Sequence, residues 1–147
     1  MIPKFRVWDK DDEHMYFVAE INLVEELISV DEYDYIFDFS DVVLMQSTGL
    51  FDVNGKEIFE GDVIKFNDVW AEYCYEGYVD GTSEGENFTE IIKTEDGFSF
   101  GRTKIQESSL FDFLSDEHMK FSEIVKSDDF NMVVVGNIYE NPELMEG

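Results

Sequence analysis

Carboxylates are the most abundant groups in this sequence that could do chemistry. The 147-residue chain holds 35 Asp and Glu residues against 10 Lys and Arg. Glycosidase-type hydrolysis needs two carboxylates facing each other across a cleft, one of them with a raised pKa. Glu60 and Asp62 flank Gly61 and would project from one face of a strand. The neighbouring sequence offers no obvious base or electrophile, so a solvated turn is the better interpretation. We expect no enzyme and no catalytic residue.

The residues that could bind a metal or act as a nucleophile lack the spacing those sites require. Asp52–Gly55 is only a fragment of a calcium loop. His14 and His118 each lack a second ligand at helical spacing, and no nucleophile motif surrounds the single cysteine, Cys74. The segment Gly81–Gly85 contains acids that would repel phosphate. We therefore expect no metal and no other cofactor.

The negative charge is spread along the chain. Residues 1–40 hold 11 acids and 3 bases, residues 41–80 hold 9 and 2, and residues 81–147 hold 15 and 5, for a net charge of −25. A hydrophobic fraction of 44% and an aromatic fraction of 16% argue against an acidic disordered chain. A folded acidic body repels nucleic acid and anionic membranes. The charge favours a protein partner, including a basic or DNA-binding one.

An aromatic run among acids is the best candidate for a partner-binding surface. Its residues are Trp70, Glu72, Tyr73, Tyr75, Glu76 and Tyr78. Single-strand binders also use aromatic platforms, but they need basic grooves. Aromatic residues flanked by acids are more typical of a protein-binding face. Packing in an ordinary β-sheet core is the competing interpretation of the same run.

The spacing of apolar residues and turns predicts a mainly β protein. Lys4–Asp9 and Met15–Val18 alternate as two strands of a hairpin. Residues 21–28 fit either a helix or a strand, and residues 109–126 fit one helix or a broken helix. Many short strands separated by turns indicate a small antiparallel barrel or curled sheet with one or two short helices.

Glycine, asparagine and proline residues mark the expected turns. Asn54-Gly55 favours a tight hairpin turn with positive φ at both positions, and Glu95–Gly97 suggests another hairpin. The expected structural turn residues are Gly49, Asn54, Gly55, Gly61, Gly136, Asn137 and Pro142.

Three segments together resemble the YopX family of phage and prophage proteins from Gram-positive bacteria. They are Lys4–Lys10, the stretch from Leu44 to Ile64, and Val135–Leu144. The resemblance implies a phage-encoded protein that acts inside the infected cell and folds with an SH3-like barrel. No established activity accompanies the family, so the resemblance supplies no catalytic residues. We interpret residues 1–147 as one domain: an N-terminal β-hairpin extension over 1–45, then a barrel part over 46–147 with an inserted segment at about 70–130.

The sequence thus favours a non-enzymatic acidic protein that binds a host or phage protein, with DNA mimicry as the strong form. Two alternatives stay open: an accessory protein of nucleic-acid metabolism, and acidity that serves solubility alone. A homo-oligomer also stays open, because strand edges and aromatic residues need cover. One cysteine, no visible secretory signal and no long apolar run indicate the host cytoplasm.

Overall fold

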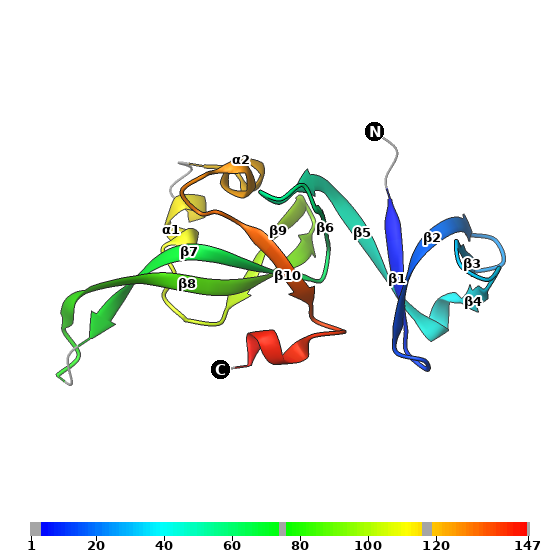
Figure 1. Cartoon of the computed structure of the whole chain (residues 1–147), viewed down its shortest axis with the longest axis horizontal. Coiled ribbons are helices and arrows are strands. Elements are labelled where there is room, and N and C mark those ends of the chain that lie inside the picture. Colours follow the sequence, from blue (N-terminus) through cyan, green and yellow to red (C-terminus); the bar gives the residue numbers. More distant parts are fainter. Residues whose placement is uncertain (1–3, 74–75, 116–118, 147) are drawn as a thin grey trace.

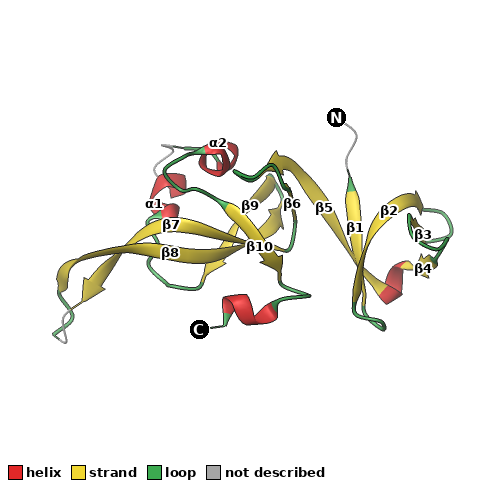
Figure 2. Cartoon of the chain, viewed as in Figure 1, coloured by secondary structure: helices red, strands yellow, loops and turns green. Residues whose placement is uncertain are grey.

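The structure, a computed structural model, describes residues 4–73, 76–115 and 119–146 of the chain. Strands dominate these residues (Figure 2). The strands are β1 Phe5–Asp9, β2 His14–Asn22, β3 Leu27–Val30, β4 Ile36–Asp38, β5 Val42–Phe51, β6 Glu57–Phe59, β7 Asp62–Tyr73, β8 Val79–Thr94, β9 Gly97–Thr103 and β10 Val133–Asn137. The helical elements are η1 Phe39–Asp41, α1 Leu110–Ser115, α2 Phe121–Lys126 and η2 Pro142–Met145.

The first sheet is antiparallel and has the order β4-β3-β2-β1-β5-β6. The β1–β2 hairpin predicted near the N-terminus is present, with Trp8 opposite Met15. Residues 21–28 form strand and turn, because the Asn22 Oδ1 accepts the backbone N–H groups of Val24 and Glu25 at 3.1 Å and closes a local turn. The segment is therefore the turn of the β2–β3 hairpin with a strand end on each side, and it forms neither a helix nor one continuous strand.

The second sheet is also antiparallel and has the order β10-β7-β8-β9. The predicted hairpin at Glu95–Gly97 joins β8 to β9, where Thr94 pairs with Gly97. The helix predicted within 109–126 is broken into α1 and α2, and α2 contacts β5 and β9. Together the two sheets and short helices confirm a mainly β fold, and the curled-sheet form of the prediction describes it, since the strands of the described residues form two open sheets.

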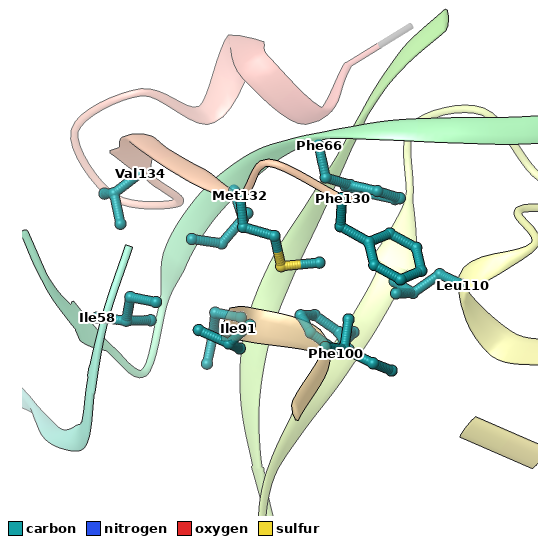
Figure 3. Close-up of a cluster of buried hydrophobic side chains, with 11 residues drawn as sticks. Ile58, Phe66, Ile91, Phe100, Leu110, Phe130, Met132 and Val134 are labelled. Atoms are coloured by element: carbon teal, nitrogen blue, oxygen red, sulfur yellow. The ribbon is translucent and has the colours of Figure 1, made fainter. Parts of the chain in front are cut away.

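Each sheet has its own apolar core. Val7, Tyr16, Ile28, Val30 and Val42 form the core of the first sheet. A larger core of eleven buried side chains lies against the second sheet, including Phe66, Ile91, Phe100 and Phe130 (Figure 3), and β6 of the first sheet adds Ile58 to it. Both helices contribute to this larger core through Leu110 of α1 and Ile124 of α2. Burial of these side chains holds the helices against the second sheet.

Strand β5 connects the two sheets in space (Figure 1). It pairs with β1 and with β6, and the domain boundary expected after residue 45 falls inside it. The segment at about 70–130 supplies the end of β7, all of β8 and β9, and both α-helices. Beyond the core, β7 and β8 continue as a long hairpin that extends away from the first sheet (Figure 1).

Candidate functional site

The part of the β7–β8 hairpin from residue 66 to residue 92 contains acidic residues and no basic ones. Seven of the 27 residues from 66 to 92 are Asp or Glu, and none is Lys, Arg or His. Among the side chains that the structure describes there, those of Glu72, Glu76, Glu84 and Glu86 are exposed. Because the hairpin extends from the body of the protein (Figure 1), these carboxylates are accessible to another molecule.

Trp70, one of the residues predicted to bind a partner, packs within this hairpin. A Cβ atom at Gly85 would lie only 2.9 Å from the Trp70 Cη2 atom, so the missing side chain makes room for the indole ring. The Trp70 Nε1 donates to the Glu72 Oε1 at 3.2 Å, and the Ser83 hydroxyl donates to the same oxygen at 2.7 Å. The indole of Trp70 and the carboxylate of Glu72 thus stabilise the pairing of the two strands.

The other predicted partner-binding residues lie around the tip of the hairpin. Tyr78 is 72% exposed, and Glu76 is also exposed. Tyr73 ends β7, and Tyr75 lies outside the described residues. The described part of the aromatic run is therefore divided between a packed Trp70 and an exposed Tyr78.

Asp68 is an acidic residue of the hairpin with a structural role. It is buried, and its Oδ1 accepts the Ser109 hydroxyl at 2.9 Å while its Oδ2 accepts the Asn87 Nδ2 at 2.8 Å. The fully buried Asn87 also accepts the Ile105 N–H at 2.8 Å and donates to the Ile105 carbonyl at 2.9 Å. These bonds fix the connection between β9 and α1 against the base of the hairpin.

A cavity of about 580 Å³ opens beside that hydrogen-bond network. The described residues that line it are Asn67, Asp68, Val69, Glu84, Gly85, Glu86, Ser109, Phe113, Met119, Asp129 and Phe130. Four of them are acidic and none of these described residues is basic. The cavity therefore combines negative charge with an apolar surface.

The apolar side of the cavity continues into the core of the second sheet. The rings of Phe113 and Phe130 meet edge to face, with centroids 5.5 Å apart, and Phe130 in turn packs on Phe66. On the acidic side, Glu84 and Glu86 stand opposite Val69 and Asn67 in the β7–β8 register, so they extend from the same sheet face.

Sequence reasoning missed this cavity. The run of 27 residues without a base was visible in the sequence and pointed to the hairpin. The contact between Phe113 and Phe130 had no comparable signal, because it depends on how α1 packs against the chain before β10.

The predicted turn at Asn54-Gly55 closes the β5–β6 hairpin with a different geometry from the one expected. Gly55 has a φ of +83°, but Asn54 does not have a positive φ, which corrects the prediction for that residue. The buried Asp52 explains the difference, because its Oδ1 accepts the N–H groups of Asn54 and Lys56. The Gly55 N–H donates to the Asp52 carbonyl at 3.0 Å, which makes a turn followed by a left-handed glycine. Asp52 is thus part of a structural turn.

Gly136 also differs from the expected turn geometry. Gly49 and Gly61 have φ values of +77° and +88°, but the φ of Gly136 is not positive. A Cβ atom at Gly136 would instead lie 2.8 Å from the Asn141 Cγ and 2.9 Å from the Leu144 Cδ1. Close packing against the C-terminal segment therefore requires glycine at this position.

Asn137 and Pro142 organise the C-terminal turn. The Asn137 Oδ1 accepts the N–H groups of Tyr139 and Glu140 at 3.0 and 2.8 Å. Pro142 begins the 3-10 helix η2, where its fixed φ suits the first helical position. This turn brings η2 back toward Gly136, in agreement with the close contacts described above.

The Glu60–Asp62 pair lies at the junction of the two sheets. The Arg6 Nη2 contacts the Asp62 Oδ1 at 2.8 Å and donates to the Glu60 carbonyl at 3.1 Å. Burial raises the pKa of Asp62, although the Arg6 charge and the Phe59 N–H oppose this effect. A raised pKa is a property of catalytic acids. However, the Asp62 side chain is only 3% exposed and both of its oxygens are engaged, so its position is structural.

The described residues offer neither a metal site nor a membrane-spanning helix. They contain no group of three or more His, Cys, Asp or Glu side chains placed to hold a metal ion. Cys74 and His118 lie outside them. No described helix has the length and apolar character needed to cross a membrane.

Comparison with known proteins places the chain in a family. Residues 4–146 match the family described as YopX protein. The crystal structure of protein EF1440 from Enterococcus faecalis is 28% identical, with a TM-score of 0.60, and the match covers 99% of each chain. No curated protein matches the sequence. The family match spans nearly the whole chain and includes the hairpin and the cavity. The chain therefore belongs to the YopX family.

Proposed function

We propose that this protein is a non-enzymatic acidic binding module, encoded by a phage or prophage, that acts on a basic protein surface in the host cytoplasm. The hairpin is the observation that carries the proposal: seven acids and no base over residues 66–92, on a ribbon that extends from the body. Opposite charge on a partner would accelerate encounter and select against acidic proteins.

DNA mimicry is the strong form of this function. In that form the exposed carboxylates of this protein take the place of DNA phosphates. They bind the surface of a host or phage protein that otherwise binds DNA. The four exposed acids of the hairpin and the net charge of −25 support it. Direct binding of nucleic acid is the competing function, and the same charges would repel phosphates.

A homo-oligomer is a second candidate, favoured by the edge strand β4. Tyr33 and Ile36 beside and within this strand are 79% and 65% exposed. Six acidic residues lie in the short stretch from 25 to 38, so two copies of this edge would repel each other. This repulsion makes a basic partner the better candidate.

A pair of charge-matched variants tests the proposal. Tagged protein would be used to capture partners from a lysate of an infected Gram-positive host at about 0.1 M and 0.5 M salt, where the Debye length shrinks from about 10 Å to a few Å. The hairpin variant carries Glu72→Gln, Glu76→Gln, Glu84→Gln and Glu86→Gln. The control carries Glu20→Gln, Glu25→Gln, Glu95→Gln and Glu143→Gln, which remove four exposed charges elsewhere.

The expected partner is basic, elutes at the higher salt, binds the control variant and is lost with the hairpin variant. A partner that stays bound at 0.5 M salt would contradict the proposal that the hairpin binds through its charge. A partner that both variants capture equally well would contradict it too. A gel shift with single- or double-stranded DNA at low salt would favour the nucleic-acid alternative.

A further inference from the structure

We propose that the cavity between the hairpin and α1 binds an arginine side chain presented by the partner protein. The inference rests on the proposed function and specifies the chemistry of that recognition. It depends on the size of the cavity, on its combination of apolar and acidic parts, and on the net charge that opposes a second copy of this chain as the occupant.

The size of the cavity fits one long side chain and the backbone around it. Its volume is about 580 Å³. This lies within the range of about 300–1,000 Å³ that is typical of small-ligand sites. The Asp68–Asn87–Ser109 hydrogen bonds hold the walls in place, since they join β7, β8 and the start of α1. A preformed site limits the entropy lost on binding.

The acidic part of the cavity offers carboxylates that the structural network does not use. Asp68 is occupied by Asn87 and Ser109. Glu84, Glu86 and Asp129 are exposed at the cavity and would receive the charged head of a ligand. Glu86 already has a cation nearby, the Lys65 ammonium at 3.6 Å, in a pair with both side chains substantially exposed. An exposed pair of this kind contributes little stability, so an incoming guanidinium can exchange with it.

The apolar part of the cavity favours arginine over lysine. Phe113, which is 38% exposed, presents an aromatic surface there, the buried Phe130 packs behind it, and Met119 adds a flexible apolar side chain. A guanidinium is planar, stacks on aromatic rings and binds a carboxylate through two parallel hydrogen bonds, whereas an ammonium is a strongly hydrated point charge. An arginine therefore matches both the rings and the carboxylates.

Of the arginines in this chain, only Arg102 is exposed enough to enter this site in a second copy. Its two arginines are Arg6 and Arg102. Arg6 is buried at the junction of the sheets, bound to Asp62. Arg102 is 64% exposed, and its Nε lies 3.9 Å from the Glu90 Oε1, so it is only weakly paired. The net charge of −25 opposes the approach of a second copy, so the occupant is expected to come from a different, basic protein.

The test uses the full-length protein and three short capped peptides that differ at one position. Each has the form Gly-Ala-X-Ala-Gly, with X as arginine, lysine or citrulline, the last being a neutral analogue of arginine. Binding would be followed by chemical-shift changes of the backbone amides. We expect the arginine peptide to shift the amides of Val69, Gly85 and Ser109 and to bind at least tenfold more tightly than the citrulline peptide.

Variants of the cavity separate its acidic and apolar contributions. Glu84→Gln with Asp129→Asn should weaken arginine-peptide binding at least tenfold, and Phe113→Leu should bring the affinities of the arginine and lysine peptides together. Glu20→Gln with Glu25→Gln removes two exposed charges elsewhere and should change binding less than twofold. Thermal unfolding of each variant shows whether it remains folded.

Each result distinguishes this inference from the broader proposal. Equal binding of the arginine and citrulline peptides, or shifts confined to other surfaces, would overturn the arginine site. Equally tight binding of the lysine and arginine peptides would overturn the inference that the site selects a guanidinium group. A captured partner that is lost with Glu72→Gln plus Glu76→Gln but is retained by the cavity variants would overturn the cavity inference and still support the acidic hairpin function.

Discussion

At the scale of single residues, Arg6 and Asp62 determine how the two sheets meet. The Arg6 guanidinium contacts Asp62, lies over the Phe59 ring at 4.8 Å and donates to the Glu60 carbonyl. The Asp62 carboxylate also accepts the Phe59 N–H at 2.8 Å. Removing charges from water is costly, and these additional contacts offset part of that cost. The pair therefore fixes the position of β1 relative to the start of β7.

The pH dependence of stability tests this description of Asp62. Burial raises the pKa of Asp62 in the folded protein above its ordinary value of 3.8. Its stabilising contribution is therefore complete below the unfolded pKa and declines as the pH rises through the folded pKa. We expect the free energy of unfolding of the wild type, minus that of Asp62→Asn, to decrease from about pH 3 to pH 7.

Urea unfolding across that pH range measures the difference. Asp96→Asn serves as the control, because Asp96 is exposed in the β8–β9 turn and its loss removes the same charge. A wild-type minus Asp62→Asn difference that increased with pH would mean that Arg6 outweighs burial.

At the scale of secondary-structure elements, the hairpin network holds the connection from β9 to α1. Asn87 is fully buried, and its side chain forms hydrogen bonds with the Asp68 carboxylate and with the backbone of Ile105. Asn87→Ala would leave the Ile105 N–H and one Asp68 oxygen without these partners. Each such loss costs about 1–3 kcal/mol when the group is buried.

We therefore expect Asn87→Ala to lower the free energy of unfolding by about 2 kcal/mol or more and to expose the start of α1 to hydrogen exchange. Urea unfolding and amide exchange at Ile105 and Ser109 provide the measurements. Asn67→Ala is the matched control, because Asn67 is exposed on the neighbouring strand. Equal stability of the two variants would contradict the structural role of Asn87.

The elements that sequence predicted well depend on local interactions. The hairpin at Glu95–Gly97 and the broken helix over 109–126 follow from neighbouring turn residues and apolar spacing. The apolar spacing of residues 21–28 suited a helix or a strand, whereas the side chain of Asn22 closes a hairpin turn there that the spacing did not predict. Gly136 shows the limit of local reasoning, since its requirement comes from contacts with Asn141 and Leu144.

The candidate site was less predictable for the same physical reason. The sequence drew attention to the aromatic run from Trp70 to Tyr78 and to its acidic flanks. It gave no indication that Trp70 would pack over Gly85 or that Phe113 would meet Phe130. Those contacts join segments whose proximity only the tertiary fold creates.

At the scale of the whole molecule, charge is the dominant property. The net charge of −25 is distributed over both sheets and the hairpin. Few cations offset this charge. In two of the ion pairs, Lys65–Glu86 and Arg102–Glu90, at least one of the two side chains is more than half exposed. Such pairs are weak in water. The folded state therefore retains strong self-repulsion, which salt or a basic partner would relieve.

This repulsion predicts that salt stabilises the protein. Raising the ionic strength from about 0.01 M to 0.15 M shortens the Debye length from about 30 Å to 8 Å, which screens carboxylates on different elements from one another. We expect the melting temperature to rise over this range, measured by calorimetry at pH 7. The variant with four hairpin acids neutralised should show a smaller rise in melting temperature, because it lacks four of the repelling charges. The control variant, with four acids neutralised elsewhere, should show a rise that is smaller than the wild type's by a similar amount. A melting temperature independent of salt would mean that bound cations already neutralise the surface, and a basic partner would then gain little from its charge.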